Sequence, residues 1–352
     1  MKVLHVIATL QMGGAERLMV DLLPALKKLG NEVDLLLING TKTAFYNELV
    51  SKGVRIHCLQ ESGKIYSLSH IIKIRKFLKK YDVIHTHTSP CQFIVAFANF
   101  IFRCDVPIVT TEHSTTNHRR NKLLLKPIDK WMYRRYKYII CISDVAKENL
   151  SKHLGYNNNL CVINNGIDYL KYENSIKDEL SSPIIISMIA SMRDAKDQDT
   201  VIKALSLMGD NYQLRLVGDG PRREDLKILA EEYNVNSNVV FMGNQNDIPK
   251  ILKESDIVIL SSHWEGLSLA SLEGMASGRP FIASDVQGLT EIVGGYGVVF
   301  PENDYKALKD EIQMLCNNIT YYKEVAARCQ ERAKQFDIRV MAEKYNDIYN
   351  SL

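Results

Sequence analysis

Apolar residues recur along the first half of the chain in two alternating patterns. Short runs rich in Val, Ile and Leu are typical of buried parallel strands, and stretches with apolar residues three or four positions apart are typical of helices. They predict strands at 2–8, 32–38, 54–58, 82–87, 106–111 and 137–142, and helices near 15–29, 43–52, 66–81, 91–102, 123–136 and 144–153. Such an alternation builds a parallel sheet with helices on both faces, and ligands gather at the carboxyl ends of its strands.

A second series of the same kind occupies the other half of the chain. The pattern loosens after residues 164–168, and segment 178–183 is the predicted linker. Strands are then predicted at 184–189, 213–217, 239–241, 256–261 and 281–284, and helices complete the chain. A length of 352 residues favours two domains, each with its own core. We therefore predict an α/β protein with two doubly wound parallel-sheet domains, residues 1–170 and 171–336.

The stretch that carries the most chemistry, residues 262–280, follows one of these strands. A loop carries Glu265 and a short helix carries Glu273, with Ser268 suited to the N-cap and Gly278 to the position after the helix. Free backbone N–H groups at a helix start attract anions, and carboxylates accept hydrogen bonds from sugar hydroxyls. This combination suits a nucleotide sugar.

Glu265 and Glu273, with seven residues between them, lie inside E-G-L-S-L-A-S-L-E-G-M-A-S-G-R-P. This block resembles the paired-glutamate motif of retaining glycosyltransferases with the GT-B fold, and more narrowly family 4, the group 1 glycosyltransferases. The resemblance covers roughly Met1 to Phe336. It implies two Rossmann-like domains that face each other across a cleft, the first for the acceptor and the second for the nucleotide sugar. It also implies that a C-terminal helix, residues 337–352, crosses back to the first domain.

The same resemblance assigns roles around the two glutamates. Glu265 would bind hydroxyls of the transferred sugar, and Glu273 would accept from the ribose hydroxyls. The backbone at Leu267 and Ser268 would contact the diphosphate. Many relatives have Gly-Phe-Gly after the first glutamate, whereas this chain has Gly266-Leu267-Ser268, so the wall of the donor pocket differs.

Two cations follow the first strand of the second domain. Arg193 and Lys196 are well placed to neutralise a leaving diphosphate, which is the main electrostatic demand of glycosyl transfer. The family has a matching Arg and Lys. The nearby Asp197-Gln198-Asp199 is a D-x-D, which holds a metal in another glycosyltransferase architecture, but acidic residues also favour a helix start. The family usually works without metal, so we expect no metal and no cofactor beyond the donor, with a UDP-sugar favoured.

Three glycine-containing turns suit close approach of a phosphate or a base. In Met12–Arg17, Gly13 and Gly14 lie between the first strand and the first helix, and the pattern is not the G-x-G-x-x-G of dinucleotide sites. A tight turn that needs a positive φ is the alternative. The family places this loop against the donor diphosphate, so Gly13 and Gly14 are assigned, and Glu16 and Arg17 are left unassigned. Gly218 and Asn244 match the family's segments at the nucleotide, although both could be simple turns.

His113 follows a strand of the first domain, and the family places a histidine of this loop near the donor sugar. An imidazole there can bond sugar hydroxyls or share charge at the reacting centre. Glu112 is the competing candidate for a contact to the acceptor. Of His85 and His87, at the preceding strand, we expect one to be a core histidine. Glu291 follows a later strand, where a role at a helix start is favoured over a contact to the donor.

Charge and cysteine content narrow the setting. Residues 1–170 hold 24 Lys and Arg against 13 Asp and Glu, and residues 171–352 hold 20 against 28. A basic half suggests an anionic partner, and two stretches, 71–80 and 119–137, mix cations with apolar residues as lipid-binding surfaces do. Ordinary amphipathic helices with snorkelling cations are the alternative, and nucleic acid is a poorer partner because no recognition module is present.

Seven cysteines, an odd number without a C-x-x-C pair, favour a reducing compartment. The apolar run 93–102 is too short to span a membrane. We therefore predict a cytoplasmic retaining glycosyltransferase that works at the inner membrane face. It would transfer a sugar to a glycan or a lipid-linked acceptor in surface polysaccharide biosynthesis. The alternatives are a nucleotide-sugar epimerase on the GT-B fold and a non-catalytic nucleotide-sugar-binding protein.

Overall fold

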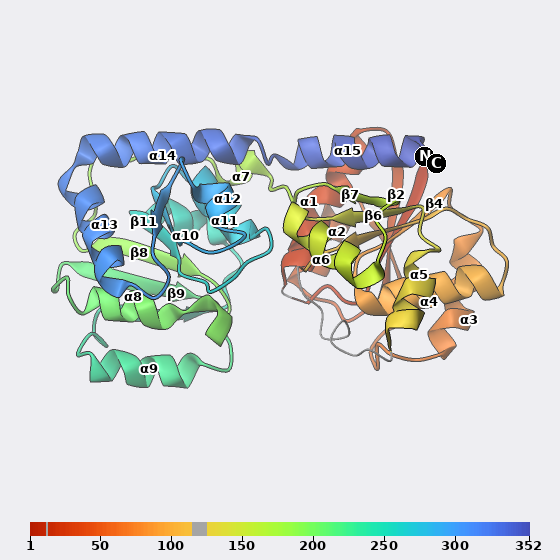
Figure 1. The fold of residues 1–352 in the computed structure, drawn as a ribbon, viewed down its shortest axis with the longest axis horizontal. Coiled ribbons are helices and arrows are strands. Elements are labelled where there is room, and N and C mark those ends of the chain that lie inside the picture. The colour runs from red at the N-terminus through yellow and green to blue at the C-terminus, as the bar shows by residue number, and fades with distance from the viewer. Residues whose placement is uncertain (12, 115–124) are drawn as a thin grey trace. The chain divides into compact units, whose positions relative to one another are not determined.

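The computed structural model describes residues 1–11, 13–114 and 125–352. The chain folds into two compact units (Figure 1). Unit 1 comprises Met1–Gly166 together with Ile338–Leu352, and unit 2 comprises Ile167–Asp337. Each unit has its own hydrophobic core, as the length of the chain predicts.

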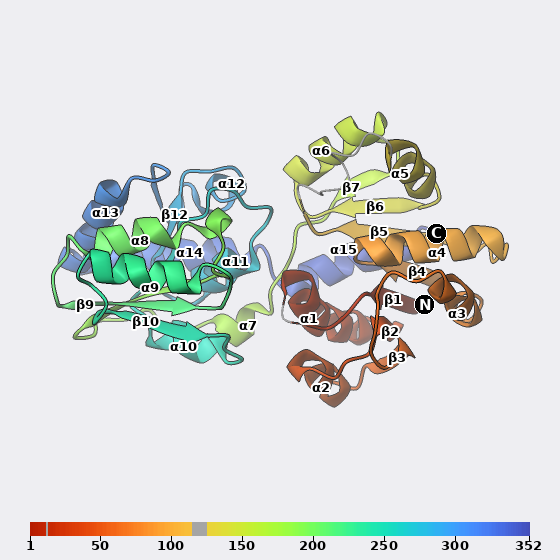
Figure 2. The ribbon, with the colours of Figure 1, turned by 90° about the horizontal axis from the view of Figure 1, so that it is seen from below.

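Unit 1 is built on a seven-stranded parallel sheet. Its strands are β1 (Lys2–Ile7), β2 (Glu32–Asn39), β3 (Arg55–Gln60), β4 (Val83–Thr86), β5 (Ile108–Glu112), β6 (Tyr138–Cys141) and β7 (Leu160–Val162). The order β3-β2-β1-β4-β5-β6-β7 can be followed along the labels of unit 1 in Figure 2. The first six strands lie within two residues of their predicted ends, and the prediction missed β7, which has only three residues.

Helices cover both faces of this sheet. They are α1 (Gly14–Lys28), α2 (Ala44–Ser51), α3 (Ser69–Leu78), α4 (Ser89–Ile101), α5 (Lys126–Tyr133), α6 (Asp144–Leu154) and α15 (Ile338–Asn350). The face that carries Leu4, Val6 and Ile84 packs against α3, α4, α5 and α6. The helix predicted at 123–136 is α5, and its first two predicted residues lie outside the described part of the chain.

The C-terminal helix α15 completes the other face of unit 1 (Figure 1). Its buried residues recur at helical spacing and form one apolar stripe: Ile338, Met341, Ala342, Tyr345 and Tyr349. The helix packs against α1, and its two buried tyrosines reach polar side chains of the sheet. The last 15 residues of the chain are therefore part of the unit 1 fold.

Unit 2 is built on a six-stranded parallel sheet in the order β10-β9-β8-β11-β12-β13. Its strands are β8 (Ile184–Ile189), β9 (Tyr212–Val217), β10 (Val239–Gly243), β11 (Ile257–Leu260), β12 (Phe281–Ser284) and β13 (Val298–Phe300). Its helices are α7 (Tyr169–Tyr172), α8 (Gln198–Leu205), α9 (Arg223–Glu232), α10 (Ile248–Glu254), α11 (Leu269–Ala276), α12 (Thr290–Val293), α13 (Tyr305–Asn317) and α14 (Ile319–Lys334). The prediction missed only β13 among these strands, again a three-residue element.

The division between the units falls at Gly166–Ile167, four residues before the predicted boundary. Segment 178–183, the predicted linker, lies inside unit 2. The buried carboxylate of Asp256 fastens this region, because it accepts from Lys177 Nζ (2.6 Å), Ser181 N (3.1 Å) and Ile185 N (2.7 Å). A loose sequence pattern here reflects an irregular backbone that is held by side chains.

Among the described residues, no helix has the length and apolar character that a membrane span requires. All seven cysteines are free thiols.

Candidate functional site

The residues predicted to carry chemistry in unit 2 all follow carboxyl ends of its strands. Arg193 and Lys196 follow β8, Gly218 follows β9, Asn244 follows β10 and Glu265 follows β11. Since these strands are parallel neighbours, their loops meet at one edge of the sheet. The sheet thus places residues from distant parts of the chain along one rim.

The direct contact at this rim joins Lys196 to Glu265. The Lys196 ammonium donates to Glu265 Oε1, which also accepts from Ser262 Oγ at 2.8 Å. The Glu265 side chain is 10% exposed and that of Lys196 is 23% exposed. A charge pair that water reaches only partly interacts more strongly with a third charge than an exposed pair does. The pair is therefore suited to act on an anion or on hydroxyl groups.

Backbone contacts hold the loops of this pair together. His263 N donates to Ala195 O (3.0 Å), and Ser261 Oγ donates to Asp197 O (2.6 Å). On the other side, Gly288 has a φ of 90°, and a Cβ there would lie 2.2 Å from Glu265 O. Only glycine allows this approach, so the loop after β12 packs against the backbone of Glu265.

The helix that carries Glu273 begins and ends as predicted. Ser268 Oγ accepts from Ser271 N at the start of α11, and Gly278, with a φ of 72°, follows its last turn. Glu273 is 7% exposed, and its Oε1 accepts from the Tyr172 hydroxyl at 2.8 Å. Glu273 lies on the same element as the Leu267–Ser268 backbone, one to two turns further along the helix.

The packing of the backbone explains why positions 218 and 220 are glycines. Gly218 has a φ of 129°, and a Cβ there would lie 2.2 Å from Ala190 O, while a Cβ at Gly220 would lie 2.3 Å from Met192 O. These glycines let the turn after β9 pack on the backbone that leads to Arg193. Arg193 itself and Asn244 are exposed, with side chains available to a ligand.

The D-x-D motif is part of the scaffold. Asp197 caps α8, since its Oδ1 accepts from Thr200 N at 3.3 Å, and burial raises the pKa of its carboxyl group. Asp199 forms two hydrogen bonds with the Arg222 guanidinium, at 2.5 and 3.1 Å. Glu291 likewise acts at a helix start, where its Oε2 accepts from Gly288 N at 2.6 Å. The helix-start predictions for all three acids are confirmed.

In unit 1, Gly13 and Gly14 follow β1 at the carboxyl edge of the sheet, and Met12 lies outside the described residues. The alternative that this turn needs positive φ is wrong, since Gly13 has a φ of −169° and neither glycine has a positive φ. A Cβ at Gly13 would meet the Glu16 carboxylate at 2.4 Å, and one at Gly14 would meet no atom of the described residues within 4 Å. Arg17 is bound to Asp21 (2.8 Å) and Glu48 (3.1 Å), a structural role.

His113, itself half-buried, is hydrogen-bonded to a chain of buried histidines. Its Nε2 shares a hydrogen bond of 3.1 Å with Nδ1 of His87, whose Nε2 shares one of 2.8 Å with Nδ1 of His5. Burial lowers the pKa of His113 to about 4 and that of His5 to about 3. Both His85 and His87 are core histidines, where the sequence favoured one. These imidazoles are neutral at physiological pH.

Glu112, the competing candidate in this loop, is a core residue. It is 4% exposed, and its Oε1 accepts from Gln92 Nε2 (2.5 Å) and from the Tyr133 hydroxyl. A carboxylate enclosed in this way is not placed to receive an acceptor substrate.

Several partners of the predicted residues were not found from the sequence. Ser262 and Gly288 lie beside the quoted motif, and a search for side chains near Glu265 could have included them. Tyr172 lies 101 residues before Glu273, and no local signal connects the two. His5 is a polar residue in the middle of an apolar strand, and a search for polar residues inside predicted strands could have found it.

Comparison with known families identifies the chain. The model of the glycosyl transferases group 1 matches residues 171–336, and the model of glycosyltransferase family 4 matches residues 12–169. The chain belongs to glycosyltransferase family 4. Its two parallel-sheet α/β units are those of the GT-B fold, and as a member of this family it is a glycosyltransferase.

Two curated proteins are similar in sequence to this glycosyltransferase. It is 30% identical over 247 residues to the UDP-Gal:α-D-GlcNAc-diphosphoundecaprenol α-1,3-galactosyltransferase of Escherichia coli. That match spans 64% of this chain and 63% of the relative. It is 25% identical to the N-acetyl-α-D-glucosaminyl L-malate synthase of Bacillus anthracis, over 76% of this chain and 74% of the relative.

Solved structures share the whole fold. The crystal structure of HepE from Anabaena in complex with UDP and glucose matches with a TM-score of 0.87 and 21% identity, over 100% of both chains. TarM of S. aureus matches with a TM-score of 0.79 and 13% identity, over 99% of this chain and 98% of that chain. The fold predicted from the sequence is confirmed.

Proposed function

We propose that this glycosyltransferase moves a sugar from a nucleotide diphosphate sugar to an acceptor hydroxyl with retention at the anomeric carbon. The observation that carries the proposal is the Lys196–Glu265 contact at the carboxyl edge of unit 2. In this reading Glu265 binds hydroxyls of the transferred sugar, and Lys196 and Arg193 bind the diphosphate. Glu273 accepts from the ribose, and Gly218 and Asn244 border the nucleotide.

The proposed reaction is a displacement on one face of the sugar. The bond between the anomeric carbon and the diphosphate oxygen breaks, and its electron pair stays on that oxygen. Lys196, Arg193 and the N–H groups at Leu267–Ser268 stabilise the charge that develops there. The acceptor hydroxyl forms the new bond on the same face and gives its proton to the departing phosphate oxygen. No protein nucleophile and no metal are required in this scheme.

Unit 1 contributes to the same reaction in our proposal. The open space in front of Gly14 supports close approach of the diphosphate to the backbone, because the fold itself does not require glycine there. His113 is neutral and placed at a strand end, which supports a hydrogen bond to the donor sugar. Gly13, Gly14 and His113 therefore complete the set of proposed donor contacts.

A UDP-sugar is the proposed donor. The E. coli relative uses UDP-Gal according to its name, and the structurally similar HepE binds UDP, UDP-glucose and glucose. Leu267 and Ser268 depart from the Gly-Phe-Gly of many relatives, which alters the pocket wall beside the sugar. We therefore expect this chain to differ from those relatives in the sugar that it transfers.

The proposed acceptor is a lipid-linked sugar of surface polysaccharide biosynthesis, and α4 supports it. Phe93, Phe97 and Phe100 follow one another at helical spacing and continue into Trp131 of α5, with ring centroids 4.6 Å apart for Phe97 and Trp131. We call these four residues the aromatic ridge. Phe100 is 51% exposed and the neighbouring Ile101 is 55% exposed, which is unusual for large apolar side chains that lie together.

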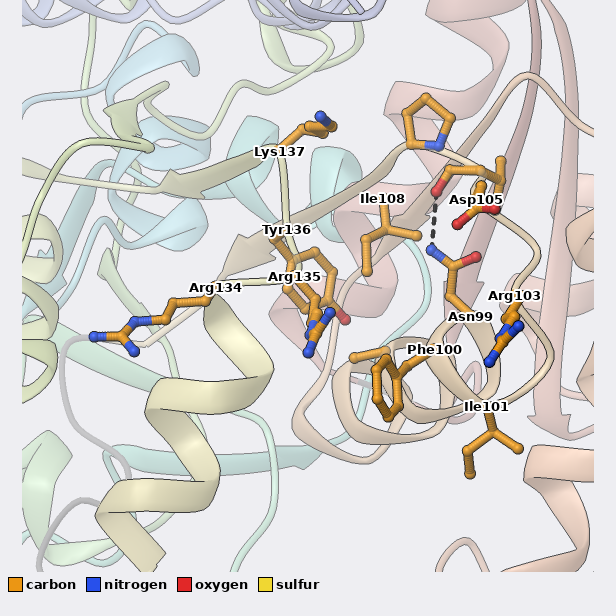
Figure 3. A pocket seen from close by; sticks show the side chains of 13 residues that line it. Asn99, Phe100, Ile101, Arg103, Asp105, Ile108, Arg134, Arg135, Tyr136 and Lys137 are labelled. Carbon is orange, nitrogen blue, oxygen red and sulfur yellow. Dashed lines mark hydrogen bonds between the residues drawn. The ribbon is translucent and has the colours of Figure 1, made fainter.

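Two cavities border the aromatic ridge. One, of about 410 Å³, is apolar and is lined by Tyr66, Leu68, Ile71, Pro90, Phe93 and Phe97. The other, of about 770 Å³, lies where α4 ends and is basic, with Arg103, Arg134, Arg135 and Lys137 on its rim (Figure 3). Arg135 lies over the ring of Phe100 at 4.4 Å, whereas Arg134 points away from it in Figure 3.

Apolar side chains among cations are the surface that an anionic membrane face attracts. The basic cavity is lined by the amino-terminal ends of β5 and β6, so it is distinct from the strand ends that carry His113. We propose that this face of unit 1 docks on anionic lipid at the inner membrane surface. Of the basic residues that the sequence singled out, Arg119, Arg120 and Lys122 lie outside the described residues.

Thermal unfolding with UDP, GDP, ADP and CMP in the presence of EDTA tests the donor proposal. A nucleotide at about a hundred times its dissociation constant adds roughly 2.7 kcal/mol of stability. We expect UDP alone to raise the melting temperature by several degrees. Sugar release and transfer from UDP-sugars, measured with and without an acceptor, then separate the alternatives. A changed sugar without acceptor would indicate an epimerase, and binding without any turnover would indicate a non-catalytic protein.

A further inference from the structure

A chain of hydrogen-bonded side chains runs from the C-terminal helix to His113. The Tyr349 hydroxyl of α15 lies 2.6 Å from Nδ1 of His85 and 3.3 Å from Nε2 of His5. From His5 the bonds continue through His87 to Nε2 of His113, at 2.8 and 3.1 Å. All but His113 are at most 1% exposed, so water does not complete these bonds.

Three of these histidines come close enough to suggest a metal site, but the orientation of their rings does not suit one. His5, His85 and His87 have nitrogens within 4.8 Å of one another. Their rings are nearly parallel, with interplanar angles of 11°, 20° and 27°. The nitrogens of these rings already face hydrogen-bond partners, and zinc prefers a tetrahedral set of ligands, which nearly parallel ring planes do not provide.

The three histidines instead determine which ring nitrogens of the chain carry a proton. Burial lowers the pKa of His5 to about 3 and those of His85 and His87 well below their ordinary value, so all three are neutral. A neutral imidazole donates at one nitrogen and accepts at the other. Because both nitrogens of His5 and His87 are engaged, fixing the direction of one bond fixes the direction of every bond up to His113.

The distances around Tyr349 favour one direction. An O–H donor favours a short bond, and an N–H donor a longer one. The 2.6 Å contact to His85 therefore suits donation by the Tyr349 hydroxyl, and the 3.3 Å contact suits donation by His5 Nε2 to the tyrosine oxygen. His5 Nδ1 then accepts from His87 Nε2, and His87 Nδ1 accepts from His113 Nε2.

We propose that Tyr349 acts as a positioning residue that holds His113 in the Nε2–H tautomer, through His5 and His87. His113 Nδ1 then carries a lone pair, and no residue in the described ranges 1–11, 13–114 and 125–352 bonds it. This inference rests on the proposed function in one respect: Nδ1 would accept a hydrogen bond from a hydroxyl of the donor sugar. His113 is the group that touches substrate, and Tyr349 acts only through the chain.

A second arm of the network provides a matched control. His85 Nε2 lies 2.8 Å from Thr111 Oγ1, which lies 2.8 Å from the Tyr345 hydroxyl. Tyr345 is on the same helix as Tyr349 and is equally buried, but it connects to His113 only by way of His85 and then Tyr349, whose hydroxyl a change at Tyr345 leaves in place. Loss of either hydroxyl removes one buried polar group, and only Tyr349 is in line with His113.

Nitrogen NMR of the histidine-labelled full chain, without substrate, tests the inference. The shifts of the ring nitrogens and their couplings to ring protons distinguish the two tautomers, and a His113→Asn variant identifies the signal. We expect the Nε2–H tautomer of His113 in the unmodified chain. We expect Tyr349→Phe to move His113 toward Nδ1–H, because His5 Nε2 then has no acceptor and is better left unprotonated. Tyr345→Phe should leave His113 unchanged.

An Nδ1–H tautomer in the unmodified chain would overturn the inference, even if Tyr349→Phe did not fold. So would a Tyr349→Phe spectrum without change, or an equal change in Tyr345→Phe. In a transfer assay, Tyr349→Phe should lower kcat/KM by roughly 2–10-fold, the worth of one hydrogen bond, with UDP binding unchanged. If the chain transfers no sugar at all, the proposed function fails, and the NMR result still decides the tautomer.

Discussion

Individual residues at the two strand-end rims separate into those that the fold requires and those that it does not. Gly218, Gly220 and Gly288 are required, because a Cβ at any of them would lie within 2.3 Å of a backbone oxygen. Gly14 is not, since a Cβ there would meet open space. From the sequence, the turn glycines suited close approach of a ligand, with an ordinary tight turn as the alternative. Only the geometry shows that most of them let one piece of backbone pack on another.

Glu265 is the residue on which the proposed chemistry depends most. Glu265→Gln keeps the shape and the hydrogen bond from Ser262 Oγ, but it removes the charge opposite Lys196. We expect transfer to fall on the order of 10²- to 10³-fold, as for other lost transition-state contacts. Steady-state kinetics with the UDP-sugar that supports turnover would measure this loss.

Glu302→Gln is the matched control, since Glu302 is another carboxylate of unit 2, 41% exposed and paired with His263. It should retain nearly full activity. Near-normal turnover of Glu265→Gln, with an unchanged melting temperature, would remove Glu265 from the mechanism.

At the scale of elements, the sequence predicted long and strongly patterned segments and missed short ones. β7 and β13 have three residues each, too few for a pattern to rise above its surroundings. The rule that ligands gather at the carboxyl ends of parallel strands places Lys196 and Glu265 at the same edge of the sheet, although their positions differ by 69 in the sequence. The same rule could not find Tyr172, because its contact with Glu273 depends on how α7 packs on α11 and not on a strand end.

The irregular segment before β8 depends on one buried carboxylate. Asp256→Ala would leave Ser181 N and Ile185 N without this acceptor and would remove the carboxylate that pairs with Lys177. Such orphaned donors should cost about 3 kcal/mol or more of unit 2 stability. Urea unfolding measures the change. Asp178→Ala, which breaks the exposed pair with Lys323, should have little effect, and equal losses in both variants would contradict the assigned anchor.

The docking of α15 should weaken in acid. His5 and His113 have folded-state pKa values of about 3 and about 4, below the unfolded value of about 6.5. The unfolded chain therefore binds more protons in this window, and the free energy of unfolding falls as the pH falls from 6.5 toward 4. Each buried histidine contributes up to about 1.4 kcal/mol per pH unit.

Unfolding at a series of pH values between 7 and 4.5 tests this dependence. His113→Asn should reduce the slope by about one proton. A free energy of unfolding that stays constant from pH 7 to pH 5 would show that the histidine chain does not resist protonation.

At the scale of the whole molecule, charge is divided between the two units. Unit 1 holds 26 Lys and Arg against 14 Asp and Glu, and unit 2 holds 18 against 27. Because unit 1 has a net positive charge and unit 2 a net negative one, an anionic surface attracts unit 1 and repels unit 2. The exposed cations and the aromatic ridge occur on the same unit, so attraction and apolar insertion act together there.

Sedimentation with lipid vesicles tests whether the cations and the aromatic ridge of unit 1 bind an anionic membrane surface. We expect binding to vesicles with anionic lipid, little binding to neutral vesicles, and loss of binding in high salt, where the screening length falls from about 10 Å to about 3 Å. Replacing both Arg134 and Arg135 by Glu should weaken binding by roughly 30-fold or more, since each cation near the surface contributes about 1 kcal/mol.

The matched control reverses the same number of charges on unit 2, at Lys227, whose side chain is 42% exposed, and at the exposed Lys250, both far along the chain from the ridge. It should leave vesicle binding almost unchanged. Equal loss in both double variants would mean that net charge alone governs the attraction. Binding to neutral vesicles as strong as to anionic ones would mean that the ridge acts without the cations. Only a loss confined to the unit 1 variant fits a docking face formed by the ridge and its basic cavity.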